Sequence, residues 1–250
     1  MLSAGRIVFS IAIVGFGVVC LMHVDFIHQL QPVPLWMPGY RLLAVLNAMA
    51  LIAGGLAILA KYKVHEATIG LAVLLAAGTV VLQPPGAFAD PSLLRSPWWI
   101  RTFEAVALAG SALVLAGVAS RPPRANCARL GRILFGVSLP VFGILHLYYA
   151  EGTATLVPAW YPVPLFWAMF TGVAHFAAGV SITEEGPLAR LAATLIGVMF
   201  AAFVLTLHLP SQLEYANARA EQTSLFVAIG MCGAAWIVAG SLGTQEGEVP

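Results

Sequence analysis

Val33-Pro34-Leu35-Trp36-Met37-Pro38 has a near copy later in the chain, Val157-Pro158-Ala159-Trp160-Tyr161-Pro162. The two stretches share the pattern V-P-x-W-x-P, and each follows an apolar run that ends in polar residues and histidine. Proline inside a helix removes a backbone hydrogen bond and clashes with the preceding turn, whereas tryptophan favours the boundary between lipid and water. We therefore interpret both stretches as connectors at a membrane surface, and their likeness predicts one design written twice.

The composition of the chain points to a bilayer as its solvent. Of 250 residues, 60% are hydrophobic and only 9% are charged, whereas soluble domains carry roughly 45–50% apolar and about 25% charged residues. The chain is therefore predicted to be a polytopic membrane protein whose main partner is the lipid bilayer. A formal net charge of +1 provides no basic field for nucleic acid, which we exclude as a partner.

The apolar runs set the predicted fold. A helix needs about 20 residues to cross a bilayer, and segments this apolar must be helical because lipid offers no hydrogen bonds to the backbone. The first run follows Met1–Arg6 and resembles a signal peptide, but no A-x-A-like cleavage site follows it, so we expect an uncleaved span. The sequence predicts an all-α fold with eight transmembrane helices, at residues 6–29, 40–60, 65–83, 98–119, 130–149, 163–183, 188–209 and 222–242.

The basic residues near the ends of the spans predict the orientation. Eight of the 12 lie on the side that would hold both termini, and four lie on the other side. The positive-inside rule therefore predicts that both termini are cytoplasmic, in a bacterial-type inner membrane, and that the two V-P-x-W-x-P connectors are outside.

The two halves of the chain align with each other. Gly5-Arg6-Ile7 falls on Gly131-Arg132-Ile133 and Gly17 on Gly143 at a constant offset, and after a two-residue shift the connectors align. Each half holds four spans, so both halves have the same orientation. We expect two tandem four-helix bundles, residues 1–120 and 130–250, joined by a cytoplasmic linker at 121–129 and related by a parallel pseudo-two-fold axis.

Several motifs carry a resemblance to a known family. They are a basic residue that opens the first span, the G-x-x-H segment Gly143–His146, an outer P-x-W connector, and the pair Thr171-Gly172 followed by Gly179. With these motifs the second half resembles the DoxX family of four-helix membrane proteins, and the whole chain resembles two such units in tandem. Some proteins resembling this family are linked to quinone-coupled oxidation of sulfur compounds. The resemblance therefore implies a quinone-linked redox role.

The chain departs from the family pattern at particular positions. In the first half, Asn47-Ala48 replaces Thr171-Gly172, and Cys20 falls where His146 stands. Relatives often show an acidic residue in the second span, where this chain has His175. We therefore expect the second half to be the closer match, and the connector that contains Trp160 to cover a working site.

Polar side chains within or beside the spans are the candidate functional residues. A charged or polar group in hydrocarbon is costly and requires a partner, and most of these residues lie towards the predicted outer ends of the helices. We therefore expect them to converge below the connectors, and predict a polar site made of His23, Asp25, His28, Arg101, Glu104, His146, His175 and His208. Its candidate lid residues are Trp36, Trp160 and Tyr161, which alternatively form an interfacial anchoring belt.

The spacing of the charged residues predicts two pairs. Asp25 and His28 are three residues apart, as are Arg101 and Glu104, so each pair is expected on one helical face. An Arg101 partner would explain how the deeply placed Glu104 is tolerated, either within a working site or as a satisfied ion pair at a helix end.

The sequence contains no metal-binding motif. It has no H-x-x-x-H, H-E-x-x-H or C-x-x-C, so the ligands of any metal or haem iron would have to come from different helices. We predict no metal site, and the cofactor remains open between a quinone and a haem.

Two functional hypotheses result. The first is a redox-associated, quinone-linked accessory subunit that works with a membrane redox partner rather than as a stand-alone enzyme. The second is a non-enzymatic membrane module, either a small-solute transporter or an assembly and scaffold partner. Few charges at mid-depth argue against an ion-coupled carrier. The absence of a nucleophile with a base and of a phosphate-binding glycine loop makes a hydrolase or kinase improbable.

Overall fold

The computed structural model describes residues 1–79 and 98–243, which form helices and the turns between them. Seven of these helices are long and apolar enough to cross a membrane. The protein is therefore a multi-span integral membrane protein, and the all-α prediction is confirmed. The helices are α1 (Leu2–His23), α2 (Tyr40–Leu59), α3 (Val64–Ala77), α5 (Trp98–Ala119), α6 (Ala125–Tyr148), α7 (Ala150–Ala154), α8 (Pro164–Glu184), α9 (Ala189–Phe203), the π-helix η3 (Val204–His208), α10 (Leu209–Glu214) and α11 (Arg219–Gly243).

Seven of the eight predicted spans correspond to these long helices, with α9, η3 and α10 together forming the seventh predicted span. The third predicted span, 65–83, corresponds to the shorter apolar helix α3. The end of that prediction falls on residues outside the described part of the chain. The π-helix η3 precedes Pro210, which has no N–H to continue an α-helical ladder.

Three predicted helix ends were wrong. The seventh predicted span ends at Glu214 rather than at residue 209. The first helix ends at His23 rather than at residue 29, because Val24 adopts a left-handed conformation with φ 48°. The amide of Asp25 then donates to the carbonyl of Cys20 at 3.1 Å, which closes the helix end. Asp25 and His28 therefore lie in the connector and not on a helical face. Helix α6 begins at Ala125 instead of residue 130, which leaves only residues 120–124 as the linker.

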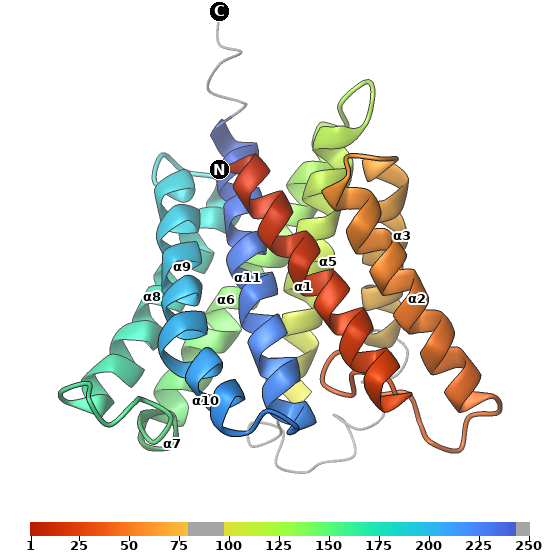
Figure 1. Ribbon diagram of the computed structural model, residues 1–250. Coiled ribbons are helices and arrows are strands. Elements are labelled where there is room, and N and C mark those ends of the chain that lie inside the picture. Colours follow the sequence, from red (N-terminus) through yellow and green to blue (C-terminus); the bar gives the residue numbers. More distant parts are fainter. Residues whose placement is uncertain (80–97, 244–250) are drawn as a thin grey trace, which may run out of the picture.

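The helices of the two halves pack against each other as one bundle. Helix α1 packs extensively on α11, and α5 packs on α6. Within the halves, α1 packs on α2 and α6 on α8, while α3 lies against α5 and α9 against α11. Figure 1 shows α1, α5, α6 and α11 in the middle, with α2 and α3 on one side and α8 and α9 on the other.

Glycine residues allow the closest helix crossings. A Cβ atom on Gly5 of α1 would lie 2.8 Å from the carbonyl oxygen of Gly233 in α11. A Cβ atom on Gly131 of α6 would lie 2.3 Å from the carbonyl oxygen of Gly110 in α5. Such contacts are shorter than non-bonded atoms tolerate, so these crossings require glycine.

The two ends of the bundle carry different parts of the chain. The start of α1 and the end of α11 lie at the same end (Figure 1), which we call the terminal face. A Cβ atom on Gly240 would lie 2.4 Å from the amide nitrogen of Leu2, in agreement with this arrangement. The opposite end carries the connectors at residues 24–39 and 149–163, and we call it the connector face.

Candidate functional site

A cavity of about 910 Å³ lies between α8 and α9. Helices α8 and α9 contact each other less extensively than α6 and α8 do. The cavity occupies the space between α8 and α9. Its α8 wall extends from Trp167 to Ser181, which corresponds to roughly 20 Å of helix. Most of its lining is aliphatic or aromatic. Such a long apolar cavity within a bilayer suits a lipid-like chain.

The ionisable residues of the cavity lie in its middle and its connector-face half. His146 occupies the last turn of α6, His208 ends the π-helix η3, and Glu104 lies in the second turn of α5. His175 lies near the middle of α8. The terminal-face half is lined by Leu188, Leu191, Ala192, Leu195 and Ile196 of the α8–α9 region. The cavity is therefore amphipathic along its length.

His146 and His175 form a pair, with their ring centroids 5.0 Å apart. Nδ1 of His146 lies 2.8 Å from the carbonyl oxygen of Phe142, and Nδ1 of His175 lies 2.8 Å from that of Thr171. Because a carbonyl oxygen only accepts, each Nδ1 carries the proton in these bonds. In the neutral rings, each Nε2 is then left as a hydrogen-bond acceptor.

Aromatic rings hold His175 in place. Phe142 and Phe200 meet it edge-on, with centroid distances of 6.0 and 5.4 Å, and Phe203 lies 6.4 Å away. His175 is only 1% exposed although it lines the cavity. A buried polar side chain that is fixed by packing on three sides is preorganised for a ligand.

Glu104 has a partner that the sequence did not indicate. Nε2 of Gln29, in the α1–α2 connector, donates to its Oε2 at 2.7 Å. The sequence predicted Arg101, one turn earlier on the same helix, as the partner of Glu104. Gln29, Ile100 and Glu104 line the cavity, so the first half of the chain contributes to a site that is otherwise built from the second half.

The three candidate lid residues differ in position. Tyr161 lines the cavity together with Val157 and Pro158 of the second connector. The ring of Trp160 packs on that of Tyr161 at 4.1 Å, but its side chain is 68% exposed. Trp36 belongs to the first connector and is 80% exposed. Tyr161 is therefore the predicted lid residue that contacts the cavity.

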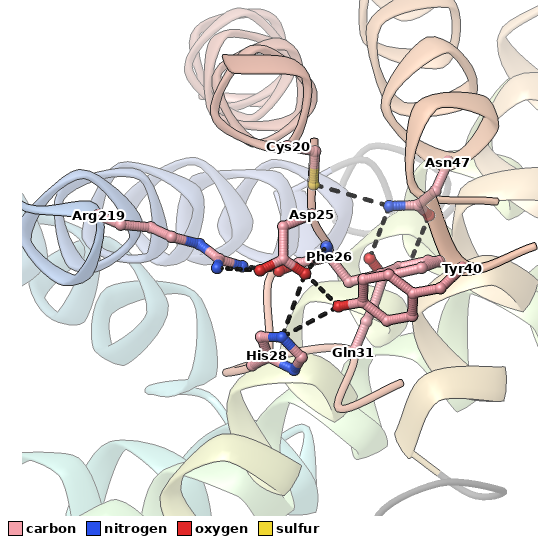
Figure 2. A network of polar contacts seen from close by, with 8 residues as sticks. All are labelled: Cys20, Asp25, Phe26, His28, Gln31, Tyr40, Asn47 and Arg219. Carbon is pink, nitrogen blue, oxygen red and sulfur yellow. Dashed lines mark hydrogen bonds and ion pairs between the residues drawn. The ribbon is translucent and has the colours of Figure 1, made fainter. Parts of the chain in front are cut away.

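Asp25 and His28, two of the predicted residues of the first half, belong to a separate polar cluster, shown in Figure 2. Arg219 of α11 pairs with Asp25 and donates to the carbonyl oxygen of Phe26. The hydroxyl of Tyr40 also donates to Asp25. Nε2 of His28 lies 3.2 Å from Oδ1 of Asp25 and 3.1 Å from the Tyr40 hydroxyl. The cluster joins the end of α1 to the starts of α2 and α11.

The charge of Asp25 is stabilised by its partners. Burial alone raises the pKa of this carboxyl, but the hydrogen bonds from Tyr40 and Arg219, together with the charges of Arg219 and His28, outweigh burial. The pKa of Asp25 therefore lies below its ordinary value of 3.8. At neutral pH the ionised Asp25 therefore links α2, α11 and the first connector through an ion pair and hydrogen bonds.

A second buried group lies beside this cluster (Figure 2). The side-chain amides of Gln31 and Asn47 exchange two hydrogen bonds, of 3.0 and 2.9 Å, and Asn47 also donates to the sulfur of Cys20. Cys20 and Asn47 are the residues that the alignment of the halves places on His146 and Thr171. In the first half, the side chain of Gln31 from the connector therefore supplies the hydrogen-bond partner of Asn47 from within the protein.

Six of the eight candidate residues are thus divided between two places, and Arg101 belongs to neither of them. Glu104, His146, His175 and His208 surround the cavity, whereas Asp25 and His28 belong to the cluster of Figure 2. His23 lies apart, with Nε2 2.9 Å from Oε1 of Gln222. Among the described residues, no group of three or more His, Cys, Asp or Glu side chains is placed to hold a metal ion.

Sequence reasoning missed Gln29, Gln31, Tyr40 and Arg219 as functional neighbours. Gln29 and Gln31 do carry a signal, since they are polar residues just before the first V-P-x-W-x-P stretch. Arg219 opens the last span at the connector face, and only the packing of α11 on α1 reveals its partner. Comparisons with protein-family models, with curated proteins and with solved structures found no match.

Proposed function

We propose that this membrane protein binds a quinone-type lipid in the cavity between α8 and α9 and serves as a redox-associated accessory subunit. The observation that carries the proposal is the amphipathic cavity itself. Its apolar length fits an isoprenoid or acyl chain, and its polar half holds His146, His175, His208 and Glu104 where a ring headgroup would lie.

The hydrogen-bonding pattern of the two histidines favours the reduced form of such a lipid. Nδ1 of His146 and of His175 donates to the backbone, so Nε2 of each neutral ring accepts. A quinol offers two hydroxyl donors, whereas a quinone offers only carbonyl acceptors. We therefore expect the cavity to bind a quinol more tightly than the corresponding quinone.

A redox role follows from this preference. Oxidation of a quinol to a quinone releases two electrons and two protons. Nε2 of His146 or His175 is suited to take a hydroxyl proton as a general base. The electrons must pass to a membrane redox partner, because the side chains around the cavity do not store them. The second hypothesis, a solute transporter or an assembly partner, uses the same cavity without electron transfer.

A binding experiment tests this proposal. The purified full-length protein is titrated with a short-chain benzoquinol and with its quinone. We expect tighter quinol binding, and about tenfold weaker binding in His146→Leu and in His175→Phe, because each loses one buried hydrogen bond. Ser138→Ala is the control, since Ser138 lies on the same helix as His146 and donates to the carbonyl oxygen of Leu134 outside the cavity.

The outcomes separate the two hypotheses. Equal binding of quinol by wild type and both histidine variants would remove the cavity assignment. If binding holds but quinol oxidation by host membranes is unchanged in a His146→Leu/Glu104→Gln double variant, the redox role is wrong. Uptake of solute into proteoliposomes would then favour the transporter.

We also propose the finer architecture that the sequence predicts: two DoxX-like units related by a parallel pseudo-two-fold axis. The helix packing supports this relation. A Cβ atom on Gly17 would meet the carbonyl oxygen of Ala48 at 2.7 Å, and one on the aligned Gly143 would meet that of Gly172 at 2.6 Å. The basic residues support cytoplasmic termini in a bacterial-type inner membrane, which a C-terminal reporter fusion would test.

A further inference from the structure

A second cavity, of about 800 Å³, lies at the terminal face between the start of α1, the α2–α3 turn and the α5–α6 connection. Of the residues that the structure describes, five cationic side chains line it, together with His65 and a single carboxylate, Glu66. The cations are Arg6, Lys61, Lys63, Arg121 and Arg124. Within residues 1–79 and 98–243, none of these five forms an ion pair with a carboxylate.

Hydrogen bonds hold two of the cations at this cavity. Arg6 donates to the carbonyl oxygens of Ile58 and Leu59 at the end of α2. Nδ1 of His65 lies 2.8 Å from the carbonyl oxygen of Ala116, so its Nε2 accepts from Arg124, whose guanidinium nitrogen is 3.4 Å away. The cluster is therefore built into the fold.

In the second half of the chain, the corresponding position contains an anion. Lys61 and Glu185 occupy aligned turns: both have left-handed backbones, with φ of 58° and 52°, and both amides donate to the aligned carbonyls of Ile58 and Ile182 at 3.2 Å. In the second half, Glu185 accepts from the buried Arg132 at 2.7 Å and lies 3.8 Å from Arg129. The first half has a lysine in place of this anion.

The start of α3 adds to the positive field. Val64 begins this 14-residue helix directly after Lys63, so its first amides face the same region with the positive end of the helix dipole. A cavity with five cations, one carboxylate and a helix N-terminus has a large excess of positive potential. An anion from outside the chain would supply the charge that Glu185 supplies in the second half.

We propose that this cavity binds a phosphate-bearing anion, beyond the function proposed for the α8–α9 cavity. Basic cavities between transmembrane helices at a membrane surface are suited to phosphate headgroups of acidic lipids. The shared chemistry is the phosphate group, which an anionic phospholipid or a free phosphate compound can supply. Arg6 and Arg124 contact it through guanidinium N–H groups, and Lys61 and Lys63 neutralise it.

The test uses the full-length protein in a neutral detergent. It is titrated with short-chain phosphatidylglycerol, with phosphatidylcholine of the same chain length, and with inorganic phosphate, while the dissociation constant and the thermal unfolding midpoint are measured. We expect phosphatidylglycerol or phosphate to bind and stabilise the protein, and phosphatidylcholine to have a much smaller effect. Binding of phosphatidylglycerol alone assigns a lipid headgroup, and binding of phosphate alone assigns a soluble anion.

Charge variants locate the site. Lys61→Gln and Lys63→Gln should each weaken anion binding about fivefold, and Lys61→Glu about 25-fold, since one surface cation contributes about a fivefold change in affinity. Arg41→Gln, which removes an exposed cation at the start of α2 on the connector face, should leave binding unchanged. The proposal is overturned if the three ligands act alike, or if Lys61→Glu binds the anions as tightly as wild type.

Discussion

At the scale of single residues, Asp25 shows how a contact between distant parts of the sequence controls the structure. Its carboxylate joins Arg219 of α11 to Tyr40 of α2 and to His28 of its own connector. Sequence reasoning selected Asp25 and His28 from their spacing, but it assigned them to a helix that in fact ends two residues before Asp25. Arg219 could not be paired with Asp25 from the sequence, since 194 residues separate them.

The lowered pKa of Asp25 leads to a prediction about acid stability. A carboxyl whose pKa is lower in the folded than in the unfolded protein stabilises the fold fully above the unfolded value of 3.8, and loses this contribution as the pH falls through the folded value. We therefore expect Asp25→Asn to lower the thermal unfolding midpoint at pH 7 and to approach wild type below pH 3.8. Thermal unfolding in detergent from pH 7 to pH 3 measures this difference, and a difference that stays constant would contradict it.

The histidines of the cavity show what the sequence could not predict about single residues. His146 and His175 were predicted as site residues because polar groups inside a membrane require a partner. The structure places their ring centroids 5.0 Å apart. Their partners are the carbonyl oxygens of Phe142 and Thr171, one helical turn earlier on the same helices. Such bonds leave no sequence signal that separates a structural histidine from a ligand-binding one. Only the cavity beside these histidines favours a ligand-binding role.

At the scale of helices, hydropathy identified the spans, but it did not locate every end. Helix α6 begins at Ala125, five residues before the predicted start, because the basic segment up to Arg129 continues the helix beyond the apolar region. Helix α1 stops at Val24, a β-branched residue that rarely adopts a left-handed backbone. Neither event changes the mean hydropathy of the span, so a pattern of apolar residues cannot reveal it.

Glycine crossings give a prediction at this scale. Gly131→Ala should destabilise the protein by about 1–3 kcal/mol, because the new Cβ atom would lie 2.3 Å from the carbonyl oxygen of Gly110 and force α5 and α6 apart. Gly70→Ala in α3 is the matched control, since nothing lies within 4 Å of its added Cβ atom. The control should equal or exceed wild type in stability, because alanine favours helix more than glycine. Equal unfolding midpoints for the two variants would contradict the close crossing.

At the scale of the whole molecule, the packing decides how the halves depend on each other. The sequence predicted two four-helix units, and the even number of spans in each unit predicted that both have the same orientation. It carried no indication that α1 packs on α11 as extensively as on α2, or that α5 packs on α6. The reason is that apolar helices of similar composition offer many possible pairings. The choice depends on where small residues such as Gly5 and Gly233 meet.

The packing of helices from one half on helices from the other predicts how the protein behaves when it is cut in the connection between α5 and α6. Fragments 1–122 and 123–250, expressed together, should co-purify in equal amounts, because α1 packs on α11 as extensively as on α2, and α5 packs most extensively on α6. Each fragment alone should aggregate, and size-exclusion chromatography with static light scattering measures both results. Gly233→Leu in the second fragment should impair reassociation, since a Cβ atom there would lie 2.3 Å from the amide nitrogen of Phe9. Gly186→Ala, which has open space around it, should not. If either fragment alone is monodisperse and fully helical, the halves are independent bundles, and the contacts between them contribute little to folding.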